Sequence, residues 1–199
     1  MDYLFAPETP FETPHFTLRG YQVDDGPLLT EAVIPSYEHL KPWMPWAVSE
    51  QSPDEARKLV RTIRGRWLLA QDFTVAIVSP DGSRLLGGCG FHLRHGGLGT
   101  RTAEMGMWIR ASEAGQGQGT RAVQALMTWG FTAWPWERLI WRCDSRNLGS
   151  ARVAEKAGLR LEGTLIANEV AVDGTRRDTL CFALLKSEWE ANCGANAFG

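Results

Sequence analysis

Residues 108–120 of this chain read WIRASEAGQGQGT. The residues up to Arg110 predict a strand, and an amphipathic helix is expected over about residues 118–132. Between the two lie three glycines at alternate positions, Gly115, Gly117 and Gly119. Glycine lets a backbone approach a ligand closely, and a helix N-terminus offers unpaired N–H groups and the positive end of the helix dipole. The stretch therefore predicts a phosphate-binding loop.

A dinucleotide-binding loop of the Rossmann type also joins a strand to a helix through glycines. That motif occurs early in a chain and is followed about 20 residues later by an acidic residue that binds a ribose. Here the loop lies past mid-chain, and the corresponding stretch is Leu139-Ile140-Trp141. The lysine of a P-loop is also missing. The sequence thus disfavours a nicotinamide oxidoreductase and leaves another phosphate-bearing ligand.

A second polar stretch, CDSRNLGS at residues 143–150, lies between an expected strand and an expected helix. Asn147 and Ser150 are three residues apart, so both can project from the first turn of that helix. They either contact a ligand together, or one of them only caps the helix.

Composition narrows the class of protein. The chain has 199 residues, of which 44% are hydrophobic and 22% charged, as expected for one globular domain. A formal net charge of −2 disfavours binding to nucleic acid, and the four cysteines and four histidines lack zinc-site spacing. The N-terminus does not resemble a signal peptide, and no apolar run approaches the ~20 residues that cross a bilayer. We therefore expect a cytoplasmic protein with no metal, no nucleic-acid partner and no membrane partner.

The periodicity predicts a mixed sheet with helices on both faces. Pro35 interrupts the first helix, and Ser52 with Glu55 forms a capping box at the start of the second. Strands are expected at residues 15–21, 73–78, 86–93, 102–110, 138–144, 160–171 and 175–186, and helices at about 27–40, 52–70, 118–132 and 148–157. One domain is expected over residues 15–190, with a loose N-terminal arm at 1–14 and a C-terminal tail at 191–199.

Together these features resemble the GNAT N-acetyltransferases, specifically their RimJ/RimL-type branch of ribosomal-protein N-terminal acetyltransferase-like proteins. The resemblance covers about residues 15–190, and its most specific stretches are AEMGMW at 103–108, the loop at 115–120 and RCDSRNLGSARVAEKAGLRLEG from residue 142. The stretches KPWMPW at 41–46 and 173–189 are similar too. It implies an α+β fold whose mostly antiparallel sheet of six to seven strands splays open between strands 102–110 and 138–144. Acetyl-CoA would lie in that opening as the co-substrate.

The resemblance also assigns residues to acetyl-CoA. Its pantetheine arm would pair with the strand backbone at Trp108, Ile109 and Arg110, much as an added strand does. A backbone N–H near Ile109 would stabilise the acetyl oxygen. Asn147 and Ser150 would reach the pantetheine and the sulfur, and the pyrophosphate would meet Gly115, Gln116, Gly117, Gln118, Gly119 and Thr120.

Two residues depart from the family pattern. Ala114 stands where members usually carry Arg or Gln, so one side-chain contact to the pyrophosphate is missing. Met107 stands where the branch commonly has Tyr, which weakens any proposal of a tyrosine acid at that point. Backbone N–H groups of the loop can still hold the pyrophosphate.

The chemistry of amine acetylation assigns the catalytic roles. An acceptor amine is mostly protonated at pH 7, because α-amines have a pKa near ~8 and lysines near ~10.4, so a base must act before attack. Alternation places Glu104 on the same strand face as Gly106 and Trp108, and it is the expected base, acting through a water; an ion pair is its competing role. Ser150 is expected to donate a hydrogen bond to the leaving thiolate. Cys143 either forms an acetyl-enzyme or is a core residue.

The acceptor is expected beside Trp43 and Trp46, whose proline-braced loop forms either an apolar wall or a plug over the core. His92 is a third substrate-side residue and a spare base. The expected function is acetyl transfer to a primary amine, a protein N-terminal α-amine or a small molecule, by direct attack in a ternary complex. A catalytically inactive acyl-CoA-binding sensor of the same fold is the alternative. A homodimer is possible by analogy with the family.

Overall fold

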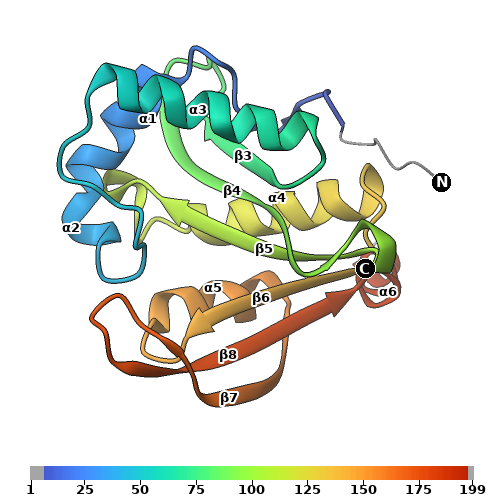
Figure 1. Ribbon diagram of the computed structural model, residues 1–199. Coiled ribbons are helices and arrows are strands. Elements are labelled where there is room, and N and C mark those ends of the chain that lie inside the picture. Colours follow the sequence, from blue (N-terminus) through green and yellow to red (C-terminus); the bar gives the residue numbers. More distant parts are fainter. Residues whose placement is uncertain (1–6, 197–199) are drawn as a thin grey trace.

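The computed structural model describes residues 7–196. At its centre is one eight-stranded sheet with strand order β1-β2-β3-β4-β5-β6-β8-β7 (Figure 1). All neighbouring strands run antiparallel except the β5–β6 pair, which is parallel. The strands are β1 (Phe11–Glu12), β2 (Thr17–Gly20), β3 (Phe73–Val78), β4 (Leu85–Gly97), β5 (Thr102–Ile109), β6 (Arg138–Asp144), β7 (Arg160–Val170) and β8 (Arg176–Leu185).

The predicted mostly antiparallel α+β sheet is confirmed, with one more strand than the six to seven expected. The extra strand is β1, which pairs with β2 inside the stretch that the sequence predicts as a loose arm. A strand of two residues between prolines is too short to show an alternating hydrophobic pattern. It forms because it pairs with the edge of β2. Residues 1–6 of the expected arm lie outside the described residues.

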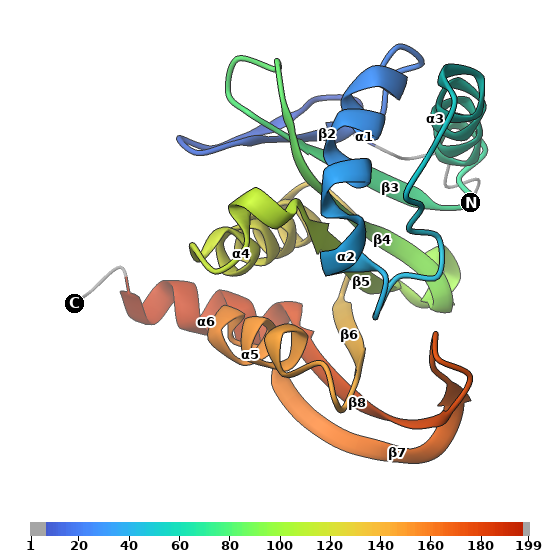
Figure 2. The same ribbon diagram turned by 90° about the vertical axis from the view of Figure 1, so that its left-hand side faces the viewer.

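Helices cover both faces of the sheet (Figures 1 and 2). On one face lie α1 (Gly26–Val33), α2 (Tyr37–Leu40) and α3 (Pro53–Leu68), and on the other lie α4 (Gln118–Thr132) and α5 (Leu148–Ala157). Pro35 does interrupt the first predicted helix, where the short 3₁₀ helix Ile34–Ser36 separates α1 from α2. The predicted capping box is present, because the Ser52 hydroxyl accepts from the Glu55 N–H and the Glu55 carboxylate accepts from the Ser52 N–H.

A further helix, α6 (Lys186–Asn196), begins where the last predicted strand ends and crosses the predicted domain boundary at residue 190. Its first turn is held by Glu188, whose carboxylate accepts from the Leu185 N–H at 2.9 Å. The Trp189 ring packs on Phe131 of α4, with ring centroids 5.6 Å apart. This aromatic contact attaches α6 to the rest of the domain.

Aromatic side chains fill the core between the sheet and α4. The rings of Phe73, Phe91, Trp129, Trp134 and Trp136 pack on one another with centroid separations from 4.8 to 6.5 Å. All five residues are buried. Because aromatic pairs bury large areas, this cluster fixes β3, β4 and α4 relative to one another.

The sheet splays open between β5 and β6. Only residues 102–105 of β5 pair with residues 138–141 of β6, although both strands continue beyond the last pair, Met105–Trp141. Past that point β6 stays paired with β8, and β5 stays paired with β4. The predicted opening is therefore confirmed, and Figure 2 shows the two halves of the sheet diverging there. Within residues 7–196, no helix is both long and apolar enough to cross a membrane.

Candidate active site

The opening between β5 and β6 leads into a cleft of about 1110 Å³. Its walls come from β4 and β5 on one side, from β6, β7 and the start of α5 on the other, and from the segment 42–48. Seven of the predicted site residues line it: Trp43, Trp46, His92, Glu104, Trp108, Asn147 and Ser150. Ile109, the last residue of β5, does not line this cleft, and neither do Arg110 and the glycine loop, which lie past the end of that strand.

Helix α4 begins at the glycine loop without a side-chain cap. Gly115 and Gly117 have φ angles of 75° and 77°, in the left-handed region that residues with a Cβ seldom adopt. With no side chain capping the first turn, its N–H groups are available to an anion. Gly119 has a packing role, because a Cβ there would lie 3.2 Å from the terminal methyl of Met107. It lets α4 approach β5 closely.

Arg121 adds a positive charge to the glycine loop. Its NH2 donates to the Gln116 carbonyl at 2.7 Å, and its Nε donates to Gln118 Oε1 at 3.3 Å. The sequence analysis did not single out this arginine, although a basic residue in the first helical turn after a phosphate-binding loop could have been predicted to bind an anion. It supplies the loop with a cation that Ala114 does not.

Along β5, the backbone N–H and C=O groups of alternate residues point either toward β4 or toward the opening beside β6. Arg110 N donates to Leu86 O at 2.9 Å, and the Trp108 carbonyl oxygen lies over Gly87 of β4. In an antiparallel pair, alternate residues face the same partner. The polar groups of Met107 and Ile109 therefore point toward the opening, where β6 has left the pairing. Of the three predicted backbone contacts, Ile109 faces the opening, whereas Trp108 and Arg110 face β4.

The Arg110 side chain is also directed away from the opening. Its NH2 contacts the carboxylate of Glu31 at 2.7 Å and the Glu31 carbonyl at 3.1 Å. This ion pair ties the end of β5 to α1. The guanidinium thus serves to join two elements in this structure.

Asn147 and Ser150 lie together at the start of α5. Asn147 is the N-cap, and its Oδ1 accepts from Ser150 N at 3.0 Å. The Ser150 hydroxyl accepts from the indole Nε1 of Trp141 at 3.1 Å. Cys143 lies beside this hydroxyl, and burial raises the pKa of its thiol, although hydrogen bonding to Ser150 works the other way. The sequence analysis treats a helix cap and a cleft residue as alternatives. Asn147 both caps α5 and lines the cleft.

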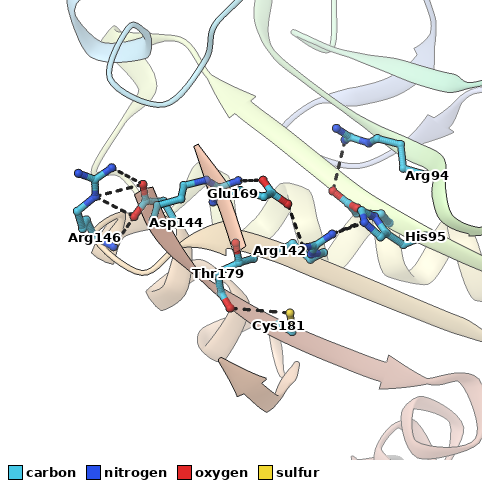
Figure 3. A network of polar contacts seen from close by, with 10 residues as sticks. Arg94, His95, Arg142, Asp144, Arg146, Glu169, Thr179 and Cys181 are labelled. Atoms are coloured by element: carbon cyan, nitrogen blue, oxygen red, sulfur yellow. Dashed lines mark hydrogen bonds and ion pairs between the residues drawn. The ribbon is translucent and has the colours of Figure 1, made fainter. Parts of the chain in front are cut away.

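Glu104 lies on the opposite wall of the cleft and is 7% exposed. Its Oε2 is 2.5 Å from His95 Nδ1, and its Oε1 is 3.4 Å from the Arg94 guanidinium. The other ring nitrogen of His95 contacts Arg142 of β6, and Arg142 NH2 donates to Glu169 at 3.0 Å (Figure 3). The sequence analysis missed His95 and Arg142, which belong to different strands and share no local motif. Glu104 thus has an ion pair and also faces the cleft.

His92 of β4 lies directly opposite Glu104 in the β4–β5 register. Its Nδ1 is 2.8 Å from Asp72 Oδ1, and its ring covers Gly106, where a Cβ would lie 2.7 Å from Nε2. Burial acts to raise the pKa of Asp72, but hydrogen bonding and the charge of His92 outweigh it and lower the pKa. His92 is therefore held by a carboxylate at the wall of the cleft.

The two predicted tryptophans form an aromatic rim of the cleft. Trp46 packs edge-on against Trp108, with ring centroids 5.7 Å apart, and is 45% exposed. Trp43 is 36% exposed. Both tryptophans line the cleft and neither belongs to the buried core. This geometry fits an apolar wall for a ligand better than a hydrophobic plug over the core.

A family model described as Acetyltransferase (GNAT) domain matches residues 15–160 of this chain. The chain belongs to the GNAT acetyltransferase family. A Bacillus subtilis relative with the provisional name ribosomal N-acetyltransferase YdaF is 29% identical over 177 residues, or 88% of this chain and 94% of that protein. The N-acetyltransferase p20 of Bacillus licheniformis is 25% identical over 181 residues, covering 89% and 96%. The expected class of acetyl-CoA-dependent N-acetyltransferase is thus confirmed.

Solved GNAT structures share this fold. The ribosomal L7/L12 α-N-protein acetyltransferase RimL, in complex with coenzyme A, aligns with a TM-score of 0.79 and 22% identity over 90% of this chain and 99% of its own. The ribosomal-protein-S5-alanine acetyltransferase of Vibrio fischeri aligns with a TM-score of 0.77 and 19% identity, over 91% and 98%. The GNAT fold and the resemblance to RimJ/RimL-type proteins are thereby confirmed.

Proposed function

We propose that this GNAT enzyme acetylates protein N-terminal α-amines by direct attack of the amine on acetyl-CoA in a ternary complex. The observation that carries the proposal is the placement of a buried carboxylate, Glu104, and a hydroxyl, Ser150, on opposite walls of one cleft. The names of the relative from Bacillus subtilis and of RimL support a protein acceptor. Small-molecule amines are the alternative acceptors.

Acetyl-CoA supplies an acetyl group activated as a thioester. The residues proposed to hold it fit such a ligand, because the first turn of α4 is uncapped and Met107 and Ile109 direct backbone groups into the opening. Arg121 would add a cation near the pyrophosphate. Asn147, as the cap of α5, would contact the pantetheine arm from the opposite wall.

The proton balance defines the roles of the chain. The acceptor begins as an ammonium and ends as an amide, so its nitrogen loses two protons while the carbon–sulfur bond breaks and sulfur keeps the electron pair. Glu104 takes the first proton through a water and passes it to solvent, and the second ends on the CoA sulfur. The Ser150 hydroxyl donates a hydrogen bond to that sulfur as its charge develops. Removal of the first proton and stabilisation of the sulfur are thus the two roles that need a side chain.

A covalent route through Cys143 is disfavoured by the burial of its thiol. The attacking species of a cysteine is the thiolate, and burial raises the pKa of Cys143. Cys143→Ala is therefore expected to keep kcat within about twofold of the wild type. A loss of turnover with trapping of an acetylated wild-type cysteine would establish the covalent route instead.

The test is thiol release from acetyl-CoA with a panel of N-terminal peptides and small amines, comparing wild type with Glu104→Gln. We expect turnover with peptides and a fall in kcat of about 10²- to 10⁴-fold in Glu104→Gln, with acetyl-CoA binding retained. Glu137→Gln, which alters an exposed glutamate outside the cleft, is the matched control.

Four other results would each contradict a part of this proposal. Turnover only with small amines would replace the acceptor class, and wild-type kcat in Glu104→Gln would remove Glu104 as the base. Binding of acetyl-CoA without thiol release from any amine would establish the sensor function. No binding would end the proposal.

A further inference from the structure

An irregularity in β4 brings two basic side chains to Glu104. Pairing between β4 and β5 is regular up to His92–Glu104 and resumes only at Gly97–Thr102. Residues 93–96 of β4 therefore stand opposite the single residue Ala103 of β5. The chain folds back closely enough that a Cβ at Gly96 would lie 2.8 Å from the Thr102 carbonyl oxygen. This bulge places His95 over the Glu104 carboxylate.

The second partner of His95 reaches across the opening of the sheet. Arg142 follows Trp141, the last residue of β6 that pairs with β5. Its guanidinium contacts His95 Nε2 and donates to Glu169, which Arg177 also contacts (Figure 3). Only 13% of the Arg142 side chain is exposed. Arg142 is therefore held by β7 and β8 while it touches a residue of β4.

These contacts decide where the proton of the His95 ring lies. An arginine guanidinium has five donors and no acceptor, so Nε2, the ring nitrogen nearer to Arg142 NH1, has to be the acceptor. Nδ1 lies 3.3 Å from the same NH1 but only 2.5 Å from the Glu104 carboxylate. In a neutral imidazole the other nitrogen then carries the hydrogen. That nitrogen is Nδ1, which faces the Glu104 carboxylate at 2.5 Å. The hydrogen-bond chain consequently runs from Arg142 through His95 to Glu104.

Resting on the proposed function, we propose that His95 is a positioning residue for the base Glu104. Arg142 fixes the His95 ring as the Nδ1–H tautomer, and the ring donates a hydrogen bond that orients the carboxylate without itself exchanging the proton taken from the amine. The charged groups that also face Glu104 are Arg94, 3.4 Å from Oε1, and the His92–Asp72 pair, in which His92 lies directly opposite Glu104 in the β4–β5 register. Glu104 Oε1 is left to accept from the water or the amine.

The activity test compares His95→Ala with His95→Asn in the thiol-release assay. An asparagine amide nitrogen can take the place of Nδ1 as a donor but cannot titrate. We expect kcat to fall by about tenfold or more in His95→Ala, with KM for acetyl-CoA unchanged, and to recover to within about threefold of wild type in His95→Asn. His39→Ala, on the exposed surface of α2, is the control.

Two activity results would overturn the proposal. If His95→Asn is as slow as His95→Ala, the ring has to titrate and acts as a proton relay. If His95→Ala keeps the wild-type kcat, the contact has no part in catalysis. Wild-type enzyme that turns over no amine would instead end the proposed function, and would leave the next measurement to decide the tautomer.

That measurement is ¹⁵N–¹H NMR of the histidine rings, assigned by loss of signal in His95→Ala. We expect the proton on Nδ1 and an unprotonated Nε2 in the wild type, and loss of this preference in Arg142→Met. A protonated Nε2 in the wild type would overturn the proposal. The wild-type spectrum decides the point even if Arg142→Met does not fold.

Discussion

The Ser150 hydroxyl shows how a single residue is prepared for its role. Its oxygen accepts from the buried indole of Trp141 at 3.1 Å, and its backbone N–H is taken by the Asn147 cap. Both the hydroxyl and the backbone at this position are therefore constrained by neighbours on β6 and α5. With the oxygen already accepting from Trp141, the hydroxyl proton, which lies beside the Cys143 sulfur, is the group that can turn to a developing thiolate.

Ser150→Ala is expected to lower kcat by about tenfold or more, because a hydrogen bond to a charged group contributes about 1.5–3 kcal/mol. Trp141→Phe keeps an aromatic ring but removes the donor that orients the hydroxyl, so a smaller fall in kcat is expected. Steady-state thiol release at saturating acetyl-CoA measures both. Equal rates for Ser150→Ala and wild type would show that the hydroxyl does not assist the leaving group.

At the scale of the element, the glycine loop and α4 form one unit. Gly117 is the N-cap in a left-handed conformation, and the Arg121 guanidinium closes over the loop by donating to Gln116 O. Gly119 sits where α4 packs on Met107. The three glycines therefore have different physical roles, of which two concern the loop conformation and one concerns helix packing.

Gly117→Ala is expected to destabilise the fold by about 1–2 kcal/mol, since a Cβ in the left-handed region clashes with the backbone. The same strain should displace the first N–H groups of α4 and raise KM for acetyl-CoA with little effect on kcat. Thermal unfolding and steady-state kinetics measure the two effects. Gly99→Ala is the control, because a Cβ there meets nothing within 4 Å. An unchanged KM would separate the loop conformation from acetyl-CoA binding.

At the scale of the whole molecule, ion pairs hold the β7–β8 half of the sheet in place beside the cleft. Asp144 at the end of β6 accepts from Arg146, which also reaches Asp173 in the β7–β8 turn at 3.1 Å. Hydrogen bonds from the Arg146 side chain lower the pKa of Asp144, although burial acts in the opposite direction. This cluster links the turn to the strand that carries Arg142 and Cys143.

Because the pKa of Asp144 is lower in the folded state, its carboxylate contributes stability above the unfolded pKa of about 3.8, and that contribution is lost as pH falls through the folded pKa. Asp144→Asn should therefore be less stable than wild type by about 1–3 kcal/mol at pH 7. The difference should shrink steadily below about pH 4. Denaturant unfolding across pH, with the exposed Asp24→Asn as control, measures it. A difference independent of pH would show that the charge is not responsible.

Local elements were predictable wherever a few neighbouring residues set the backbone. The Ser52–Glu55 capping box appears where the sequence predicts it, and Asn147, one of the two candidate caps, caps α5. Each depends on hydrogen bonds within a few residues. The strand β1 and the helix α6 were missed, because one needs the edge of β2 and the other packs on Phe131.

The sequence by itself determined the family motifs, the glycine loop and the placement of Glu104 on a strand, because these depend on neighbours along the chain. Only the tertiary structure decided what surrounds that carboxylate. His95 reaches Glu104 through the irregularity in β4, and Arg142 reaches His95 because β6 parts from β5 one residue earlier. Likewise, Arg110 points to Glu31 through a contact between β5 and α1. Contacts between distant strands follow from register and splay, which no local pattern encodes.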